Sequence, residues 1–102
     1  MVINPYAIEK FTSAVHSMAV SPKSIQDRVA DAYVFNLSHV KTSDLPESMC
    51  YRFEQLKEKL TSGKPVGNEG TVQAKTNTMS DTEAIETAQE IMYLYDEITH
   101  LA

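Results

Sequence analysis

The chain has 102 residues and a mass of 11.4 kDa, and 9 basic residues stand against 14 acidic ones. This length predicts a single domain over residues 1–102, and a 42% share of apolar residues with only 3 glycines excludes wholesale disorder. The net charge of −5 disfavours nucleic acid as a partner, and no apolar run approaches the roughly 18 residues of a membrane span. Because the chain has one cysteine and starts without a signal-peptide pattern, we expect a cytoplasmic protein.

Helical spacing first appears over residues 5–18. Asn4 is a favourable N-cap, and Pro5 suits the first helical position because it has no N–H to satisfy. The apolar residues of this segment cover one narrow arc, and they are Ala7, Ile8, Phe11, Ala14, Val15 and Met18. A single narrow arc predicts packing against one neighbour or groove.

A second helix is predicted over residues 22–41, with Ser21 as its cap and Pro22 in the first position. Its main apolar face consists of Ile25, Val29, Ala32, Tyr33, Leu37 and Val40. Asn36 falls near the centre of this face, where an unpaired amide costs on the order of 1–3 kcal/mol. We therefore expect Asn36 either to bond a loop or fix the helix register, or to line a groove.

A third helix is predicted over residues 45–61, where Asp44 and Glu47 have the spacing of a capping box. Its apolar residues form a narrow stripe of Met49, Phe53, Leu56 and Leu60. Residues 62–79 hold all three glycines and one proline, and they form the one long connection of the chain. We expect a loop with a helical turn there, because the segment is too polar for a longer element.

A fourth helix is predicted over residues 81–101, because Ser80 and Glu83 form a capping box in front of it. Apolar side chains cover roughly 200° of its circumference, far more than in the other segments. The chain is thus predicted to be all-α, a small single-domain bundle of four main helices with one long Gly/Pro-containing connection. The wide apolar arc predicts a central place in the bundle or a homodimer that buries part of this helix.

Few residues suggest chemistry. The histidines lie on three different predicted helices, and the sequence contains no metal-ligand spacing and no phosphate-binding loop. We therefore expect neither a metal nor a cofactor. Cys50 lies beside the stripe of the third helix and is expected to be a small, half-buried apolar residue. The one weak catalytic hypothesis is a small enzyme that uses Asp27, Arg28, Asp31 and His39. Arg28 and Asp31 are also an ordinary surface ion pair in spacing.

The charge is unevenly distributed along the chain. Residues 76–102 carry six acidic side chains and no Lys or Arg. On the fourth helix, one tyrosine misses the apolar arc and lies among carboxylates, which gives a candidate partner-binding set of Glu86, Glu90, Tyr93 and Glu97. Tyr51 and Phe35 also point away from the apolar faces of their helices.

These features predict a non-enzymatic protein–protein interaction protein that binds a basic partner through an acidic helical face. An accessory, inhibitor or immunity type of protein from a bacterium or phage fits the size of the chain, and that source is a guess from size alone. An ordinary solvated helix face is the simpler interpretation of the same residues. A different alternative is a small-molecule-binding module with a pocket between the second and fourth helices, lined by Tyr33, Asn36, Met92 and Tyr95.

Overall fold

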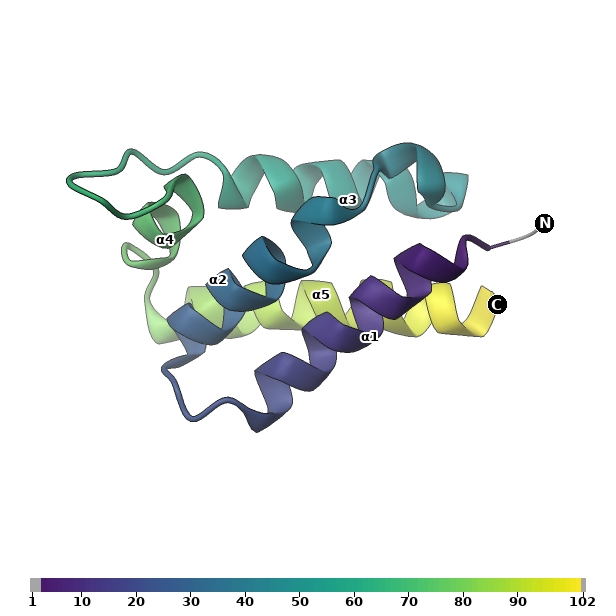
Figure 1. Ribbon diagram of the computed structural model, residues 1–102, viewed down its shortest axis with the longest axis horizontal. Helices are drawn as coiled ribbons and strands as arrows, with labels where there is room; N and C mark the ends of the chain where they lie inside the picture. Colours follow the sequence, from purple (N-terminus) through teal and green to yellow (C-terminus); the bar gives the residue numbers. More distant parts are fainter. Residues whose placement is uncertain (1–2, 102) are drawn as a thin grey trace.

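The computed structural model describes residues 3–101, and within them it contains helices and no strand. The α-helices are α1 (Pro5–Val20), α2 (Ile25–Phe35), α3 (Glu47–Leu60), α4 (Thr71–Thr76) and α5 (Asp81–Leu101). Two short 3₁₀ turns, η1 (Leu37–His39) and η2 (Thr42–Asp44), connect α2 to α3. The prediction of an all-α bundle with four main helices is therefore confirmed (Figure 1).

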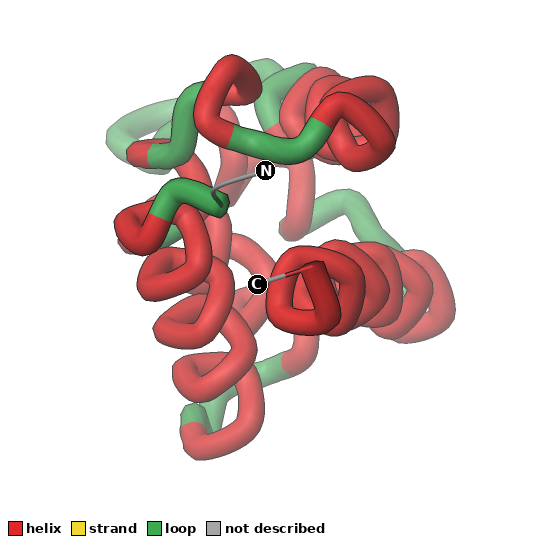
Figure 2. The backbone as a smooth tube through the Cα atoms, turned by 90° about the vertical axis from the view of Figure 1, so that its right-hand side faces the viewer, coloured by secondary structure: helices red, strands yellow, loops and turns green. Residues whose placement is uncertain are grey.

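The bundle is elongated, with extents of 43 × 25 × 21 Å. The first two helices form a hairpin, and α3 runs along the opposite side of the molecule, antiparallel to α5 (Figure 1). The last helix packs on α1, α2 and α3, which is the central position expected from its wide apolar arc. Figure 2 looks along the longest axis of the molecule, and the long helices are arranged around that axis.

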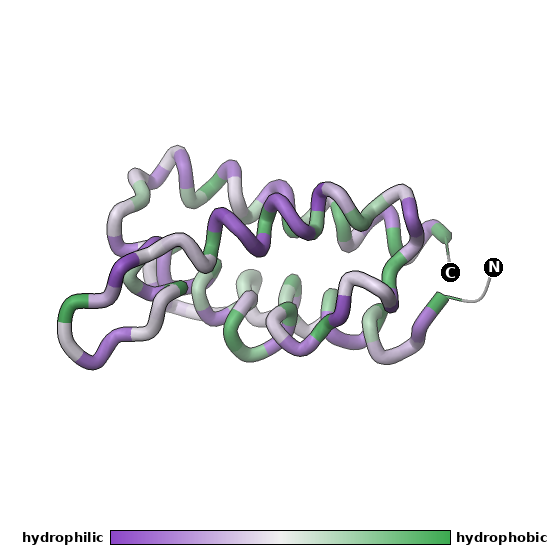
Figure 3. The backbone as a smooth tube through the Cα atoms, turned by 90° about the horizontal axis from the view of Figure 1, so that it is seen from above, coloured by the Kyte–Doolittle hydropathy of each residue, from purple (hydrophilic) through white to green (hydrophobic). Residues whose placement is uncertain are grey.

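One apolar core joins these helices. Its largest fully buried apolar side chains are Phe11, Phe53, Leu37, Met49, Leu56, Leu60, Ile91, Leu94 and Ile98. The predicted stripe of the third helix is buried in full, and hydrophobic and hydrophilic residues alternate along the trace as amphipathic helices require (Figure 3). No helix among the described residues is both long and apolar enough to cross a lipid bilayer.

The starts of the first and last helices follow their sequence signals. The side chain of Asn4 accepts hydrogen bonds from the backbone N–H groups of Tyr6 and Ala7, at 2.9 and 3.3 Å. The Ser80 hydroxyl accepts from the Glu83 N–H at 3.1 Å. These caps satisfy donors that the first turn of a helix leaves without intrahelical partners.

The predicted bounds of the second helix are wrong at both ends. Ser24 and not Ser21 is the N-cap, and its side chain accepts from the Asp27 N–H at 3.1 Å. The helix ends at Phe35, because Asn36 leaves helical geometry with φ −132° and ψ −68°. A 3₁₀ turn then buries Leu37 while turning the chain towards α3, so burial in the core overrides the helical spacing of the sequence.

The third helix is two residues shorter at its start than predicted. The capping box does not form, since η2 takes up Asp44 and the N-cap position is Pro46, without a side-chain hydrogen bond. The long connection contains the expected helical turn as α4, which buries Val72. The connection before α4 projects from one end of the bundle (Figures 1 and 3).

Gly63 allows this connection to pack closely on α4. A Cβ built on Gly63 would lie 2.3 Å from the Thr71 carbonyl oxygen and 2.5 Å from the Lys75 nitrogen. Both contacts are shorter than real Cβ atoms tolerate, and both are with backbone, which cannot move aside as a side chain can. Glycine is therefore required there by the close approach of two backbone segments.

Candidate interaction surface

The predicted partner-binding residues lie on one side of α5. Glu86 and Glu90 are exposed, Glu97 is half-buried, and Tyr93 keeps 63% of its surface accessible. Their spacing of three or four residues places them in a row along the helix. The structure thus brings together the side chains that the sequence pattern assigned to this face.

The neighbouring helix α3 supplies positive charge to the same surface. Arg52 forms an ion pair with Glu97, whose other carboxylate oxygen accepts from the Ser48 hydroxyl at 2.8 Å. Lys59 Nζ lies 2.8 Å from Glu90 Oε1. Helical spacing did not predict the contribution of these α3 residues, because the two ion pairs join positions 45 and 31 residues apart in the sequence.

A groove of about 270 Å³ lies between α3 and α5. Leu94, which is only 2% exposed, contributes apolar surface, and the remaining lining residues are Arg52, Gln55, Glu90 and Tyr93. Tyr51 is 74% exposed and lies one turn before Gln55, on the solvent side of α3. We call the surface formed by Ser48, Tyr51, Arg52, Gln55, Lys59, Glu86, Glu90, Tyr93, Leu94 and Glu97 the α3–α5 face.

The ion pairs shape the electrostatics of this face. The hydrogen bond from Arg52, followed by that from Ser48, lowers the pKa of the Glu97 carboxyl below its ordinary value of 4.5. Both pairs remain partly accessible to water, and exposed ion pairs of this kind contribute about 0–1 kcal/mol each. An incoming charged group can therefore displace either pair at small cost.

The residues of the alternative ligand pocket do not line the clefts of about 500, 270 and 260 Å³. Tyr33 is buried in the core, and burial followed by the negative charge of Glu54 raises the pKa of its hydroxyl. Asn36 ends α2 and is half-buried, so the prediction that places it mid-face on a continuous helix is wrong. Met92 is exposed and Tyr95 half-buried, and the clefts described here are lined by other residues.

Three of the four residues of the enzyme hypothesis have separate partners, and the fourth is exposed. Asp27 accepts from the Gln73 side chain at 3.0 Å, and Asp31 pairs with Lys23 at 2.9 Å. Arg28 donates to the Met18 carbonyl oxygen near the end of α1, at 3.2 Å. His39 is exposed in η1, beyond the end of α2. These contacts are structural, and they leave the four side chains without a shared reacting position.

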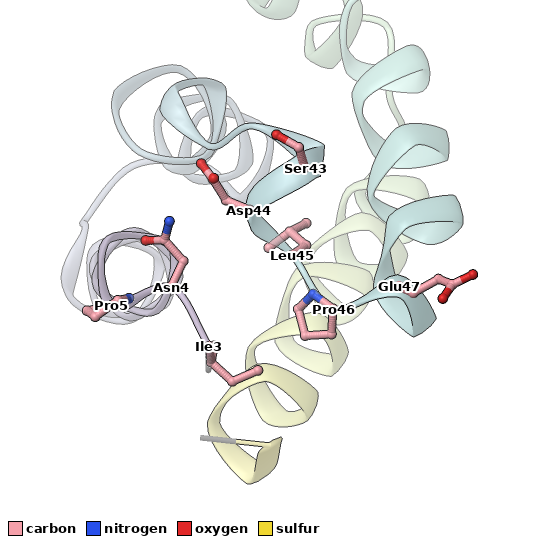
Figure 4. A pocket seen from close by; sticks show the side chains of 8 residues that line it. All are labelled: Ile3, Asn4, Pro5, Ser43, Asp44, Leu45, Pro46 and Glu47. Carbon is pink, nitrogen blue, oxygen red and sulfur yellow. The ribbon is translucent and has the colours of Figure 1, made fainter. Parts of the chain in front are cut away.

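A cleft of about 500 Å³ lies where the start of α1 meets the segment between η2 and α3, as Figure 4 shows. Asn4 and Asp44 stand on its two sides, but the Asn4 oxygen is already the cap of α1. Another cleft, of about 260 Å³, lies between α2 and α4 beside Phe35, which is 65% exposed. The lining of the first cleft includes two carboxylates, Asp44 and Glu47, but the Glu47 side chain points away from Asp44 (Figure 4).

Cys50 matches its expected half-buried position. Its thiol lies 3.5 Å from the carbonyl oxygens of Thr42 and Pro46, and 3.8 Å from that of Leu45. Within residues 3–101, no cluster of three His, Cys, Asp or Glu side chains is arranged to hold a metal ion. Comparison with protein-family models, curated proteins and solved structures finds no match to this chain.

Proposed function

We propose that this protein is a non-enzymatic interaction protein, of accessory, inhibitor or immunity type, that binds a basic partner protein through the α3–α5 face. The supporting observation is the exposure of Tyr93 beside the groove between α3 and α5. Tyrosine and arginine are enriched at protein interfaces because they combine contact area with hydrogen-bonding groups. The face carries both residue types around Leu94 and has a polar rim.

The charge of α5 supports a basic partner. Ion pairs between described residues engage two of its six carboxylates, those of Glu90 and Glu97. The other four are exposed, and they belong to Asp81, Glu83, Glu86 and Asp96. The negative potential that remains attracts cationic surfaces over a distance of about 8 Å at physiological salt.

The first test is affinity capture from the native host with three matched baits. Wild type and Tyr6→Ala are expected to retain the same partner, whereas Tyr93→Ala loses it. Tyr6 is a suitable control because it is an exposed tyrosine, 46% accessible, on a different helix. Equal retention by all three baits would contradict the proposal.

Rate constants then separate attraction from contact. Glu86→Gln removes a carboxylate with no ion pair to another described residue, so it is expected to slow association and weaken its salt dependence. Tyr93→Ala is expected to speed dissociation by an amount worth about 1–2 kcal/mol or more. The control for Glu86→Gln is Glu9→Gln on α1, which is expected to change neither rate. Surface plasmon resonance with the captured partner measures both rate constants. If neither variant changes them, the α3–α5 face is an ordinary solvated surface and the proposal is contradicted.

The compartment and source belong to the same proposal. A cytoplasmic setting agrees with the single, half-buried Cys50. A bacterial or phage origin rests on chain size alone. The compartment in which the captured partner resides tests the first point.

A further inference from the structure

The α3–α5 face has a charge pattern that is complementary to itself. One edge, on α3, carries Arg52 and Lys59, and the other edge, on α5, carries Glu97 and Glu90. The helices are antiparallel (Figure 1), and the two ion pairs join positions seven residues apart on each helix, so both pairs link residues at about the same height along the bundle. Each cation of the basic row is therefore level with one carboxylate of the acidic row.

We propose that a second copy of the chain covers this face, related by a two-fold axis that runs along the groove between α3 and α5. A half-turn about such an axis exchanges the two rows but leaves every residue at its height. Arg52 of the second copy then lies opposite Glu97, and Lys59 of the second copy lies opposite Glu90. The exchange is reciprocal, as in the isologous interfaces of two-fold symmetric dimers.

The same operation fills the groove. Along α5, Tyr93 lies between Glu90 and Glu97, and along α3, Gln55 lies between Arg52 and Lys59. Tyr93 of the second copy therefore lies level with Gln55, over the apolar surface of Leu94 and beside the Arg52 guanidinium. A tyrosine ring gains from burying apolar area and from a neighbouring cation.

In the dimer, each charged group of the two ion pairs has more neighbours of opposite charge than it has in the monomer. In the dimer Glu90 and Glu97 each lie between two cations, one from each copy, and surface ion pairs contribute more when they form such networks. The wide apolar arc of α5, from which the sequence predicts a dimer, is buried within the monomer at Ala84, Ile91, Leu94 and Ile98, whereas Ile85, Met92 and Leu101 stay exposed. In the proposed dimer, the contact between the copies is made by the α3–α5 face and not by the apolar arc of α5.

This inference adds regulation to the proposed function, because the second copy and a basic partner would compete for one face. Self-association itself is measured without any partner, so the two ideas fail independently. A dimer without a captured partner would leave only the proposed function unsupported. A captured partner with a monomeric protein would refute only the dimer.

Sedimentation equilibrium of the full chain tests the dimer. We expect a mass of twice 11.4 kDa at high concentration in about 0.05 M salt, and weaker association in about 0.5 M salt, where charges are screened. Tyr93→Ala is expected to weaken the dimer by about tenfold or more, and Tyr6→Ala to leave it unchanged. A mass of 11.4 kDa at every concentration and salt would overturn the proposal.

Charge reversal gives the sharper test. Arg52→Glu and Glu97→Arg each place like charges opposite one another in their own homodimers, so each variant alone is expected to be monomeric. In an equimolar mixture, both exchanged contacts again join opposite charges, and the dimer is expected to return. Damage to the fold within a copy cannot be repaired by mixing, so rescue would assign the loss of the dimer to the reversed charges. Absence of rescue between folded variants would refute the two-fold arrangement.

A second pair of variants protects the test against misfolding. Lys59→Glu and Glu90→Lys reverse the other ion pair, which lies more than one turn away on each helix. Circular dichroism melts identify the folded variants, and the mixing experiment is run with whichever pair folds. Rescue in either folded pair supports the arrangement, and a folded pair without rescue contradicts it.

Discussion

The rings of Phe11 and Phe53 meet in the core with their centroids 6.0 Å apart and their planes inclined by 59°. This contact joins α1 to α3 across 42 residues of sequence, and both side chains are at most 1% exposed. Tilted aromatic pairs contribute about 0.5–1.5 kcal/mol beyond the area that they bury. The pair therefore holds α3, and with it one edge of the α3–α5 face, against the rest of the bundle.

Truncating this contact is expected to destabilise the protein severely. Phe53→Ala removes a fully buried ring and leaves a cavity, which typically lowers the free energy of unfolding by about 3–5 kcal/mol. Urea unfolding followed by circular dichroism measures the loss. Tyr51→Ala is the matched control, because that aromatic residue is 74% exposed on the same helix and its loss should cost less than about 0.5 kcal/mol.

The central helix offers a second matched pair. Ile91 is fully buried and Ile85 is 50% exposed, and both lie on α5. We expect Ile91→Ala to lower the free energy of unfolding by roughly 2–5 kcal/mol, and Ile85→Ala to lower it much less. Denaturant melts that give under about 1 kcal/mol for Ile91→Ala would contradict the position of α5 in the core.

The close packing of the long connection predicts a strong effect of a single methyl group. Gly63→Ala would push a Cβ against the backbone of α4, and forced overpacking typically costs about 1–3 kcal/mol. Gly70→Ala is the control, since a Cβ at Gly70 meets no atom within 4 Å. Its expected cost is limited to the poorer capping by alanine at the start of α4, under about 1 kcal/mol. Equal thermal melting temperatures for the two variants would contradict this packing.

The observed start of α2 can be checked with two serines. Ser24→Ala removes the N-cap side chain and is expected to cost about 1 kcal/mol. Ser21→Ala should cost less, because Ser21 precedes the helix and its hydroxyl accepts only from the exposed Lys23 N–H. Urea midpoints decide between them, and a larger loss for Ser21→Ala would favour a helix that starts at Pro22.

The ion pair on the α3–α5 face predicts a dependence of stability on pH. The Arg52 and Ser48 hydrogen bonds lower the pKa of Glu97 in the folded state, so the folded protein binds this proton less readily than the unfolded chain does. The stabilisation is fully present above the ordinary pKa of 4.5, and it is lost as the pH falls through the lower folded-state value.

Comparison with Glu97→Gln isolates this contribution. The wild type is expected to be more stable than the variant at about pH 6, and the difference should shrink as the pH falls below about 4. Urea unfolding at both pH values provides the measurement. A difference that stays constant with pH would show that the Glu97 carboxylate gains nothing from its partners.

Local signals predicted much of the secondary structure. The capping residues Asn4 and Ser80 predicted where α1 and α5 begin, because an N-cap depends on hydrogen bonds within a single turn. The apolar stripe of α3 was equally readable, since its spacing reflects the period of one helix. Among the candidate site residues, helical phase alone placed Glu86, Glu90, Tyr93 and Glu97 on one side.

Local signals were ambiguous where two patterns competed. Ser21 and Ser24 are both acceptable caps, and the sequence contains no local feature that excludes the first. The apolar spacing continues past Phe35, yet the chain leaves the helix at Asn36 because Leu37 and Val40 reach the core through a 3₁₀ turn. Core packing settles such a competition, and it involves residues far away in sequence.

The sequence by itself therefore determined the helical class, the cap-defined helix starts and the exposed tyrosine among carboxylates, because each depends on neighbours within one or two turns. Only the tertiary structure brought Arg52 to Glu97 and Lys59 to Glu90, which are 45 and 31 residues apart. Those ion pairs turn an acidic helix into one edge of a mixed-charge groove. Their formation depends on the antiparallel packing of α3 on α5, and that packing is fixed by apolar burial over the whole chain rather than by the charged residues themselves.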